Sequence, residues 1–268
     1  MEKEKEKQVA ILIDGDNISH QYAEYIKQEA MNYGNIKVFR LYGSVKSPSV
    51  KSWYKVMPLQ GIVPMLQITY ANGKSIADQS LTIDAMDLLY TNELDVFCIV
   101  SSDSDYVKLV YRLKEAGKLV IGMGEKKTRE AMAKACDEFK ILDLIYKDVD
   151  SAVETEIKNT SSEEPNSDAE DVQNMDVMEE DVEISISPEE EIIDDIREYI
   201  ELADGDRINL SEIGTHLTKR YLGFDARNYG HKNMTKMIVK YKDKLGVEVN
   251  TEDNPDGIHK IIYIDKKK

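Results

Sequence analysis

The sequence predicts an α/β protein, with a doubly wound parallel sheet followed by a C-terminal winged-helix-like α+β domain. Unbroken apolar runs such as 9–13 and 96–100 are typical of strands that are buried on both faces. Segments with helical periodicity separate these runs, and such alternation builds a parallel sheet with right-handed crossovers. Beyond residue 187 the pattern changes to helical segments and a hairpin, which is the order of a winged-helix module.

The elements of the sheet domain follow from local signals. Gly34 ends the first helix, and Pro58 and Gly61 interrupt the chain after a short helix. Pro64 places the third strand at an edge of the sheet, where a missing N–H donor is tolerated. The expected strands are 9–13, 36–42, 62–66, 95–100, 119–123 and a last extended segment at 139–142; the expected helices are 18–32, 49–56, 77–90, 106–116 and 128–136.

Charge is distributed unevenly along the chain, whose net charge is −16. Residues 151–187 hold 12 acidic residues and one lysine, a net of −11, so the remainder carries only −5. Because this stretch is polar, acidic and poor in aromatic residues, residues 148–187 are predicted to be a disordered linker. The acidic balance of the whole chain therefore does not exclude a polyanionic partner.

The C-terminal module, 188–268, begins with helix-start signals. Ser187, Pro188 and Glu190 match a capping box that has proline at the first helical position, and a second capping box spans 209–212. The expected elements are a helix from 188, helices at 209–221 and 231–244, and a hairpin built from 247–249 and 261–264.

Several classes of protein are disfavoured by the composition. Residues 1–7 are charged and lack an apolar core, so no signal peptide is expected, and no apolar run approaches the length of a membrane span. The two cysteines, Cys98 and Cys136, form no Cys-x-x-Cys pair or Cys/His cluster, which argues against a zinc site or a disulfide framework. A reducing cytoplasm is the expected location.

Acidic residues cluster at one predicted edge of the sheet. Asp14 and Asp16 follow the first strand, Asp78 begins a helix, and Asp103 and Asp105 follow the fourth strand. The first and fourth strands should be neighbours at the switch point of a doubly wound sheet, where such folds bind ligands. Carboxylates packed together repel one another, and a divalent cation would neutralise them and could activate water for attack on a phosphodiester.

Each acidic residue also has a purely structural explanation. The stretch 14–17 could be an ordinary turn, Asp103 and Asp105 could cap the following helix, and Asp78 could be a first-turn acid that the helix dipole favours. Their expected convergence on one edge favours a shared site for Mg²⁺ or Mn²⁺, because these ions prefer oxygen ligands.

The segments 13–17, 77–84 and 101–106 together resemble the NYN domains of the PIN-like nuclease superfamily, which include the LabA-like proteins. The similarity covers about residues 8–146, so residues 1–147 are assigned to this domain. It implies a metal-dependent ribonuclease of PIN-like fold, although Ser102 stands where glycine is usual. By matching position, the resemblance implies catalytic roles for Asp14, Asp78, Asp103, Asp105 and Asn17, with Asp14, Asp78, Asp103 and Asp84 around Mg²⁺ or Mn²⁺.

The segments 223–225 and 228–230 make residues 188–268 resemble a LOTUS (OST-HTH) domain, a family of RNA-binding winged helices. From Arg207 to Leu245 there are nine basic and three acidic residues, a local net of +6, as expected for contact with phosphates. The alternative is a lysine face that is only solvated, in which case the domain would bind a protein or contact RNA through another face. The lysines expected to contact RNA are Lys232, Lys236 and Lys240 on the third helix, and Lys74 in a loop of the first domain.

Two functions are compatible with these features. The first is a metal-dependent ribonuclease whose C-terminal domain recruits RNA; the second is a non-catalytic RNA-binding or scaffold protein that keeps the PIN-like fold. The complete set of acidic residues favours the ribonuclease. A dinucleotide-binding enzyme is disfavoured because Gly122 and Gly124 lack the third glycine of that fingerprint. RNA is the expected partner, no membrane association is expected, and the chain could pair with a second copy of itself.

Overall fold

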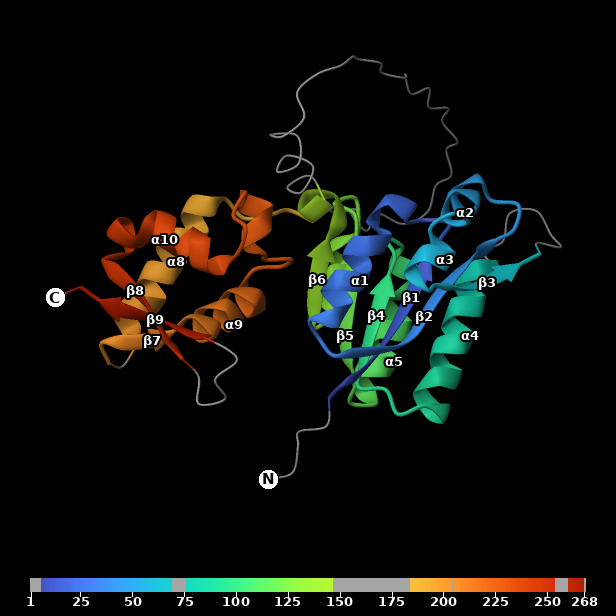
Figure 1. Ribbon diagram of the computed structural model, residues 1–268, viewed down its shortest axis with the longest axis horizontal. Helices are drawn as coiled ribbons and strands as arrows, with labels where there is room; N and C mark the ends of the chain where they lie inside the picture. Colours follow the sequence, from blue (N-terminus) through green and yellow to red (C-terminus); the bar gives the residue numbers. More distant parts are fainter. Residues whose placement is uncertain (1–5, 69–75, 147–183, 204, 254–259, 268) are drawn as a thin grey trace, which may run out of the picture.

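The computed structural model describes residues 6–68, 76–146, 184–203, 205–253 and 260–267 (Figure 1). Its first domain is built around a six-stranded parallel sheet flanked by helices, and its second combines helices with a small antiparallel sheet, which confirms the predicted fold class. Lys74 and residues 148–183 of the predicted linker lie outside the described residues.

The large sheet has the strand order β3-β2-β1-β4-β5-β6, and all its strand pairs are parallel. β1 lies between β2 and β4, so the switch point is where the sequence predicted it. β3 is an edge strand, as Pro64 indicated. The strands are β1 (Gln8–Asp14), β2 (Asn35–Ser44), β3 (Val63–Gln67), β4 (Val96–Val100), β5 (Leu119–Gly124) and β6 (Glu138–Ile141).

Each face of this sheet is covered by its own layer of helices. Leu81, Leu113 and Met132 belong to the core under α4, α5 and α6, whereas Ile26 and Trp53 belong to the core on the opposite face. Residues 9–13 are completely buried because both layers cover β1. The helices are η1 (His20–Tyr22), α1 (Ala23–Met31), α2 (Pro48–Trp53), α3 (Met57–Gln60), α4 (Ile76–Thr91), η2 (Ser104–Tyr106), α5 (Val107–Glu115) and α6 (Glu130–Ala135).

The expected break at Pro58 was wrong. Pro58 lies in the first turn of the short helix α3, where its missing N–H would have had no partner in the helix. The chain turns instead at Gly61, whose φ of 76° is in the left-handed region. The sequence therefore missed one short helix but placed the following strand correctly.

The C-terminal domain is winged-helix-like, as predicted. Its small sheet has the antiparallel order β7-β9-β8, in which β7 is a short strand that the sequence did not indicate. Figure 1 shows this domain beside β6, at the opposite edge of the large sheet from β3. The elements are α8 (Glu189–Leu202), β7 (Arg207–Asn209), α9 (Leu210–Arg220), η3 (Ala226–Tyr229), α10 (Met234–Leu245), β8 (Val247–Asp253) and β9 (Lys260–Lys266).

The predicted helix starts in this domain were correct at one position and wrong at two. Asn209 caps α9 by accepting a hydrogen bond of 2.9 Å from the Ser211 N–H. The capping box at Ser187 was wrong, because α8 begins at Glu189 and the Ser187 carbonyl instead accepts from the Tyr229 hydroxyl at 3.0 Å. The third helix begins after its cap at Asn233 rather than at residue 231.

Residues 184–187, the end of the predicted linker, pack against the first domain. Ile184 is 1% exposed, and its N–H donates to the Thr128 carbonyl at 3.3 Å. Ile186 is partly buried against the same core. The linker prediction was wrong for these four residues, because the side chains of Ile184 and Ile186 pack against the apolar core of the first domain.

Candidate functional site

Asp14 ends β1 at the carboxyl edge of the sheet and is completely buried. Its Oδ2 atom accepts hydrogen bonds from Asn17 Nδ2 at 2.7 Å and from Ser101 Oγ at 2.9 Å. The Tyr106 hydroxyl lies 3.4 Å from the same oxygen. The Asn17 amide and the Ser101 hydroxyl, which come from two neighbouring βα turns, therefore hold the Asp14 carboxylate in one orientation.

The other oxygen of Asp14, Oδ1, is buried and has no hydrogen-bond partner within the described residues. Burial raises the pKa of the Asp14 carboxyl; hydrogen bonds from Asn17 and Ser101 oppose this shift, and the charge of Asp16 adds to it. A buried carboxylate oxygen without a donor is costly unless something positive approaches it. The position is therefore suited to a cation.

Asp78 lies in the first turn of α4, directly opposite Tyr106. The Tyr106 hydroxyl donates to Asp78 Oδ1 at 3.0 Å, so one hydroxyl connects Asp78 with Asp14. Burial and the charge of Asp14 raise the pKa of the Asp78 carboxyl to about 6, although the Tyr106 hydrogen bond lowers it in part. Burial is thus the larger cause of the raised pKa of Asp78, whereas the sequence had pointed only to repulsion between carboxylates.

Asp103 joins the same group through Ser101. The Ser101 hydroxyl donates to Asp14 and accepts from the Asp103 N–H at 3.0 Å, and the charge of Asp103 contributes to the raised pKa of Asp78. Asp103 is also the N-cap of η2, because its Oδ1 accepts from the Asp105 N–H at 2.9 Å. The capping explanation is confirmed for this residue, and Asp103 also lies in the same acidic group as Asp14 and Asp78.

The other predicted site residues are Asn17, Asp105 and Asp84, and each lies in a different environment. Asn17 orients Asp14, and Asp105 is exposed on η2 beside the acidic group. Asp84 was expected among the metal ligands, but its carboxylate is taken by two donors of β2. It pairs with Arg40 at 2.5 Å and accepts a short hydrogen bond from the Tyr42 hydroxyl. This geometry favours a role for Asp84 in fixing α4 against β2.

Sequence reasoning missed the donors that organise the acidic residues. Ser101 and Tyr106 flank Asp103 in the sequence, but nothing in their local pattern shows that they contact Asp14. Arg40 and Tyr42 are two residues apart on β2, so they share one face of the sheet, and that spacing was the available signal. Ser102, which replaces the usual glycine, accepts a hydrogen bond of 3.0 Å from the Glu125 N–H.

The residues at this edge suit Mg²⁺ or Mn²⁺ in their chemistry. Asp14, Asp78 and Asp103 supply only oxygen ligands, and Asp14 Oδ1 is a buried acceptor without a donor. Among the described residues, no three acidic, histidine or cysteine side chains are already arranged around a common ion position. A bound ion would therefore require these acidic side chains to move toward a common point.

Ionisation of Asp78 is expected to destabilise the fold. Because its folded-state pKa of about 6 lies above the ordinary value of 3.8, stability is lost as the pH rises between these two values. Asp78 is only half-buried, so we expect Asp78→Asn to raise the free energy of unfolding by about 1 kcal/mol at neutral pH without divalent ions. Urea unfolding measures this, with the exposed Asp87→Asn as control. If Asp78→Asn still raised the free energy of unfolding at pH values well below 3.8, ionisation of Asp78 would not be the cause.

The C-terminal domain presents the basic surface that the sequence predicted. Met237 and Ile238 of α10 are buried, and its lysines are exposed. Lys240 lies 3.6 Å from Glu189 of α8, and Lys244 lies 3.4 Å from Asp194 of the same helix. Among the described residues, no ion pair engages the three remaining lysines of this surface, which are Lys232, Lys236 and Lys242.

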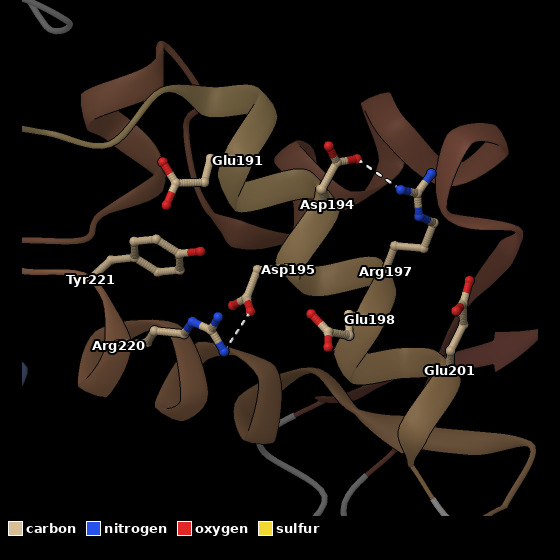
Figure 2. A pocket seen from close by; sticks show the side chains of 8 residues that line it. All are labelled: Glu191, Asp194, Asp195, Arg197, Glu198, Glu201, Arg220 and Tyr221. Carbon is tan, nitrogen blue, oxygen red and sulfur yellow. Dashed lines mark ion pairs between the residues drawn. The ribbon is translucent and has the colours of Figure 1, made fainter.

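Acidic side chains occupy the neighbouring surface of α8. A groove of about 550 Å³ lies between α8 and the end of α9. Figure 2 shows the side chains that line it. Asp195 pairs there with Arg220 at 3.0 Å, and Asp194 pairs with Arg197 at 3.2 Å. Because most of the charged residues that line this groove are acidic, the groove is unfavourable for an anionic ligand. The groove is lined by Glu191, Asp194, Asp195, Arg197, Glu198, Glu201, Arg220 and Tyr221.

Each of the two domains matches a known protein family. The sequence model of the NYN domain matches residues 8–143, about half of the chain. The chain belongs to the NYN domain family. The OST-HTH/LOTUS domain matches residues 187–256, so the predicted pairing of the two domains is confirmed. NYN domains have a nuclease-like fold of the PIN-like superfamily, and LOTUS domains are RNA-binding.

Two further proteins are similar to part of this chain. An uncharacterized protein of Methanocaldococcus jannaschii is 24% identical over 123 residues, which are 44% of this chain and 48% of that protein. The chain thus spans about half the length of this relative. A crystal structure of a protein of unknown function from Vibrio parahaemolyticus is 21% identical, with a TM-score of 0.43, and the match covers 52% of this chain and 94% of that one. Within the described residues, each helix is too short or too polar to cross a membrane.

Proposed function

We propose that this NYN protein is a ribonuclease that depends on Mg²⁺ or Mn²⁺ and that recruits RNA through its LOTUS domain. The observation that carries the proposal is the buried Oδ1 atom of Asp14, which has no donor among the described residues and lies beside two further carboxylates. Asp14, Asp78 and Asp103 would hold the ion. A divalent ion there would polarise a phosphodiester and ease deprotonation of water.

Other residues of the chain would orient the acidic side chains and contact the RNA. Asn17 and Ser101 hold Asp14 by its Oδ2 atom, so Oδ1 stays directed away from their donors. The Tyr106 hydroxyl holds Asp78 next to Asp14 and restricts its rotation. Lys232 and Lys236 would contact the phosphates of the RNA, which is the usual source of affinity that does not depend on base sequence.

The affinity for the metal should fall as the pH falls. Asp78 must be ionised to bind a cation, and its pKa is raised to about 6. Below that pH, one proton must be released per bound ion, so we expect the affinity to drop about tenfold per pH unit. Isothermal titration with Mn²⁺ on either side of the Asp78 pKa measures this. An affinity that is independent of pH would exclude Asp78 as a ligand.

Metal removal tests the function directly. Labelled single-stranded and structured RNA is incubated with the full chain in the presence of Mn²⁺ or of EDTA. We expect cleavage with Mn²⁺, loss of cleavage with EDTA, and recovery when excess Mn²⁺ is added. In parallel, Mn²⁺ should raise the Tm, because a ligand that binds only the folded state stabilises it. Cleavage that persists in EDTA would contradict the proposal.

A non-catalytic RNA-binding protein is the alternative. It is favoured by the present directions of the Asp78 and Asp103 side chains, which are held by Tyr106 and by the Asp105 N–H. RNA binding without cleavage, and without a Tm shift on adding Mn²⁺, would support this alternative.

A further inference from the structure

A short segment of the LOTUS domain, residues 222–227, reaches across to β6 and α1 of the NYN domain; we call it the docking segment. Leu222 packs against the NYN core, as part of the same apolar cluster as Ile184 and Ile186. The segment therefore joins a mixed apolar cluster that contains residues from both sides of the predicted linker.

Gly223 brings the two backbones close together. A Cβ atom at this position would lie 3.1 Å from Ile141 Cδ1 at the end of β6, and 3.8 Å from the Phe139 carbonyl. Its φ of 66° is in the left-handed region, which glycine adopts without strain. A glycine here thus permits a contact with the edge strand that a larger residue would obstruct.

Two ion pairs connect the domains beside this apolar contact. Arg227 donates a short hydrogen bond to Glu29 of α1, and it also holds Asp225 with two bonds of 2.9 and 2.7 Å. Lys140 of β6 lies 3.6 Å from Asp225. Burial by itself would raise the pKa of the Asp225 carboxyl, but Arg227 and Lys140 lower it below its ordinary value.

The Glu29 contact is specific to the docked arrangement. Glu29 is 4% exposed, and its charge lies on a face of α1 that the LOTUS domain covers. Loss of one partner of a buried pair leaves an uncompensated charge, so this contact strongly disfavours small displacements of the domain. The docking segment therefore connects the two domains by apolar packing, a close backbone approach and two ion pairs.

We propose that the docking segment keeps the two domains in one fixed arrangement, and that this arrangement sets where the acidic site cuts a bound RNA. The second part rests on the proposed function. The docking segment ends six residues before Asn233, the cap of α10, so the basic helix is anchored close to the interface. RNA held on α10 would then meet Asp14, Asp78 and Asp103 at a constant distance. A freely tethered domain would allow a broad range of distances.

The test uses the full chain with a charge reversal on the NYN side. Glu29→Lys places a lysine against Arg227, and Glu24→Lys makes the same charge change on an exposed position of the same helix. Leu222→Ser is a second variant, which removes the apolar contact from the LOTUS side. Circular dichroism establishes that each variant is folded.

Small-angle scattering and cut-site mapping are then compared. We expect the wild type and Glu24→Lys to scatter as one docked particle, and Glu29→Lys and Leu222→Ser to have a larger radius of gyration. A 5′-end-labelled RNA with one stem-loop and a single-stranded tail should be cut by the wild type within a narrow window, and by the two interface variants over a wider one. The affinity of this RNA for each interface variant should stay within about twofold of the wild-type affinity, because the lysines of α10 are unchanged.

Two results would overturn the proposal. Wild-type scattering that fits only separated, mobile domains would contradict the docking. Unchanged cut positions in variants that scatter as separated domains would contradict the control of the cut site. If the wild type cut no RNA, the proposed function would fail, but the scattering comparison would still decide whether the domains dock.

Discussion

Replacing Asp103 by asparagine is expected to abolish RNA cleavage while leaving the fold intact. The fold should persist because Asp103 caps η2 by accepting from the Asp105 N–H, and asparagine caps helices equally well. The cleavage should fall because the substitution removes a negative charge from the proposed ion site. Loss of several kcal/mol of charge stabilisation corresponds to a rate reduction of roughly 100-fold or more.

Single-turnover cleavage with excess Mn²⁺ measures this effect. Asp87→Asn is the matched control, because Asp87 is an exposed acid of α4 in the same domain and its replacement makes the same charge change. Titration with Mn²⁺ gives a second readout, in which Asp103→Asn should bind the ion more weakly and the control should not. Wild-type cleavage by the folded Asp103→Asn variant would exclude Asp103 from the site.

The sequence could predict which strands meet at the site, because that depends on local patterns. Apolar runs identify strands buried on both faces, and alternation with helices determines a parallel sheet with β1 beside β4 at the switch point. Acidic residues that follow these strands must then lie at one edge. The convergence of Asp14 and Asp103 near Asp78 follows from this topology alone.

The sequence could not predict how each carboxylate is oriented. Asp84 pairs with Arg40, which is 44 residues away, and the Ser101 hydroxyl that holds Asp14 comes from a strand 87 residues away. Such contacts depend on side-chain geometry after the sheet has formed. The pair between Glu29 and Arg227 spans 198 residues, and no periodic pattern signals it.

Lys232 and Lys236, at the start of the basic surface, are expected to provide most of the affinity for RNA. Changing Lys232 and Lys236 together to glutamine should weaken binding and flatten its salt dependence, because each lost phosphate contact lowers the slope by roughly 0.7 to 0.9. Lys240 was expected to contribute equally, but Glu189 already offsets part of its charge. Lys240 should therefore contribute less than its two neighbours.

The matched control is a second pair of lysines on the same basic surface. Changing Lys240 and Lys244 together to glutamine makes the same change in net charge, but these lysines already pair with Glu189 and Asp194 of α8. Filter-binding titrations at several salt concentrations should show a smaller change in slope for this pair. Cleavage at saturating RNA should be nearly unchanged in both variants, because the acidic residues lie in the other domain. Equal effects of the two pairs would mean that only the total charge of α10 matters, and no effect of either would mean that RNA contacts another face.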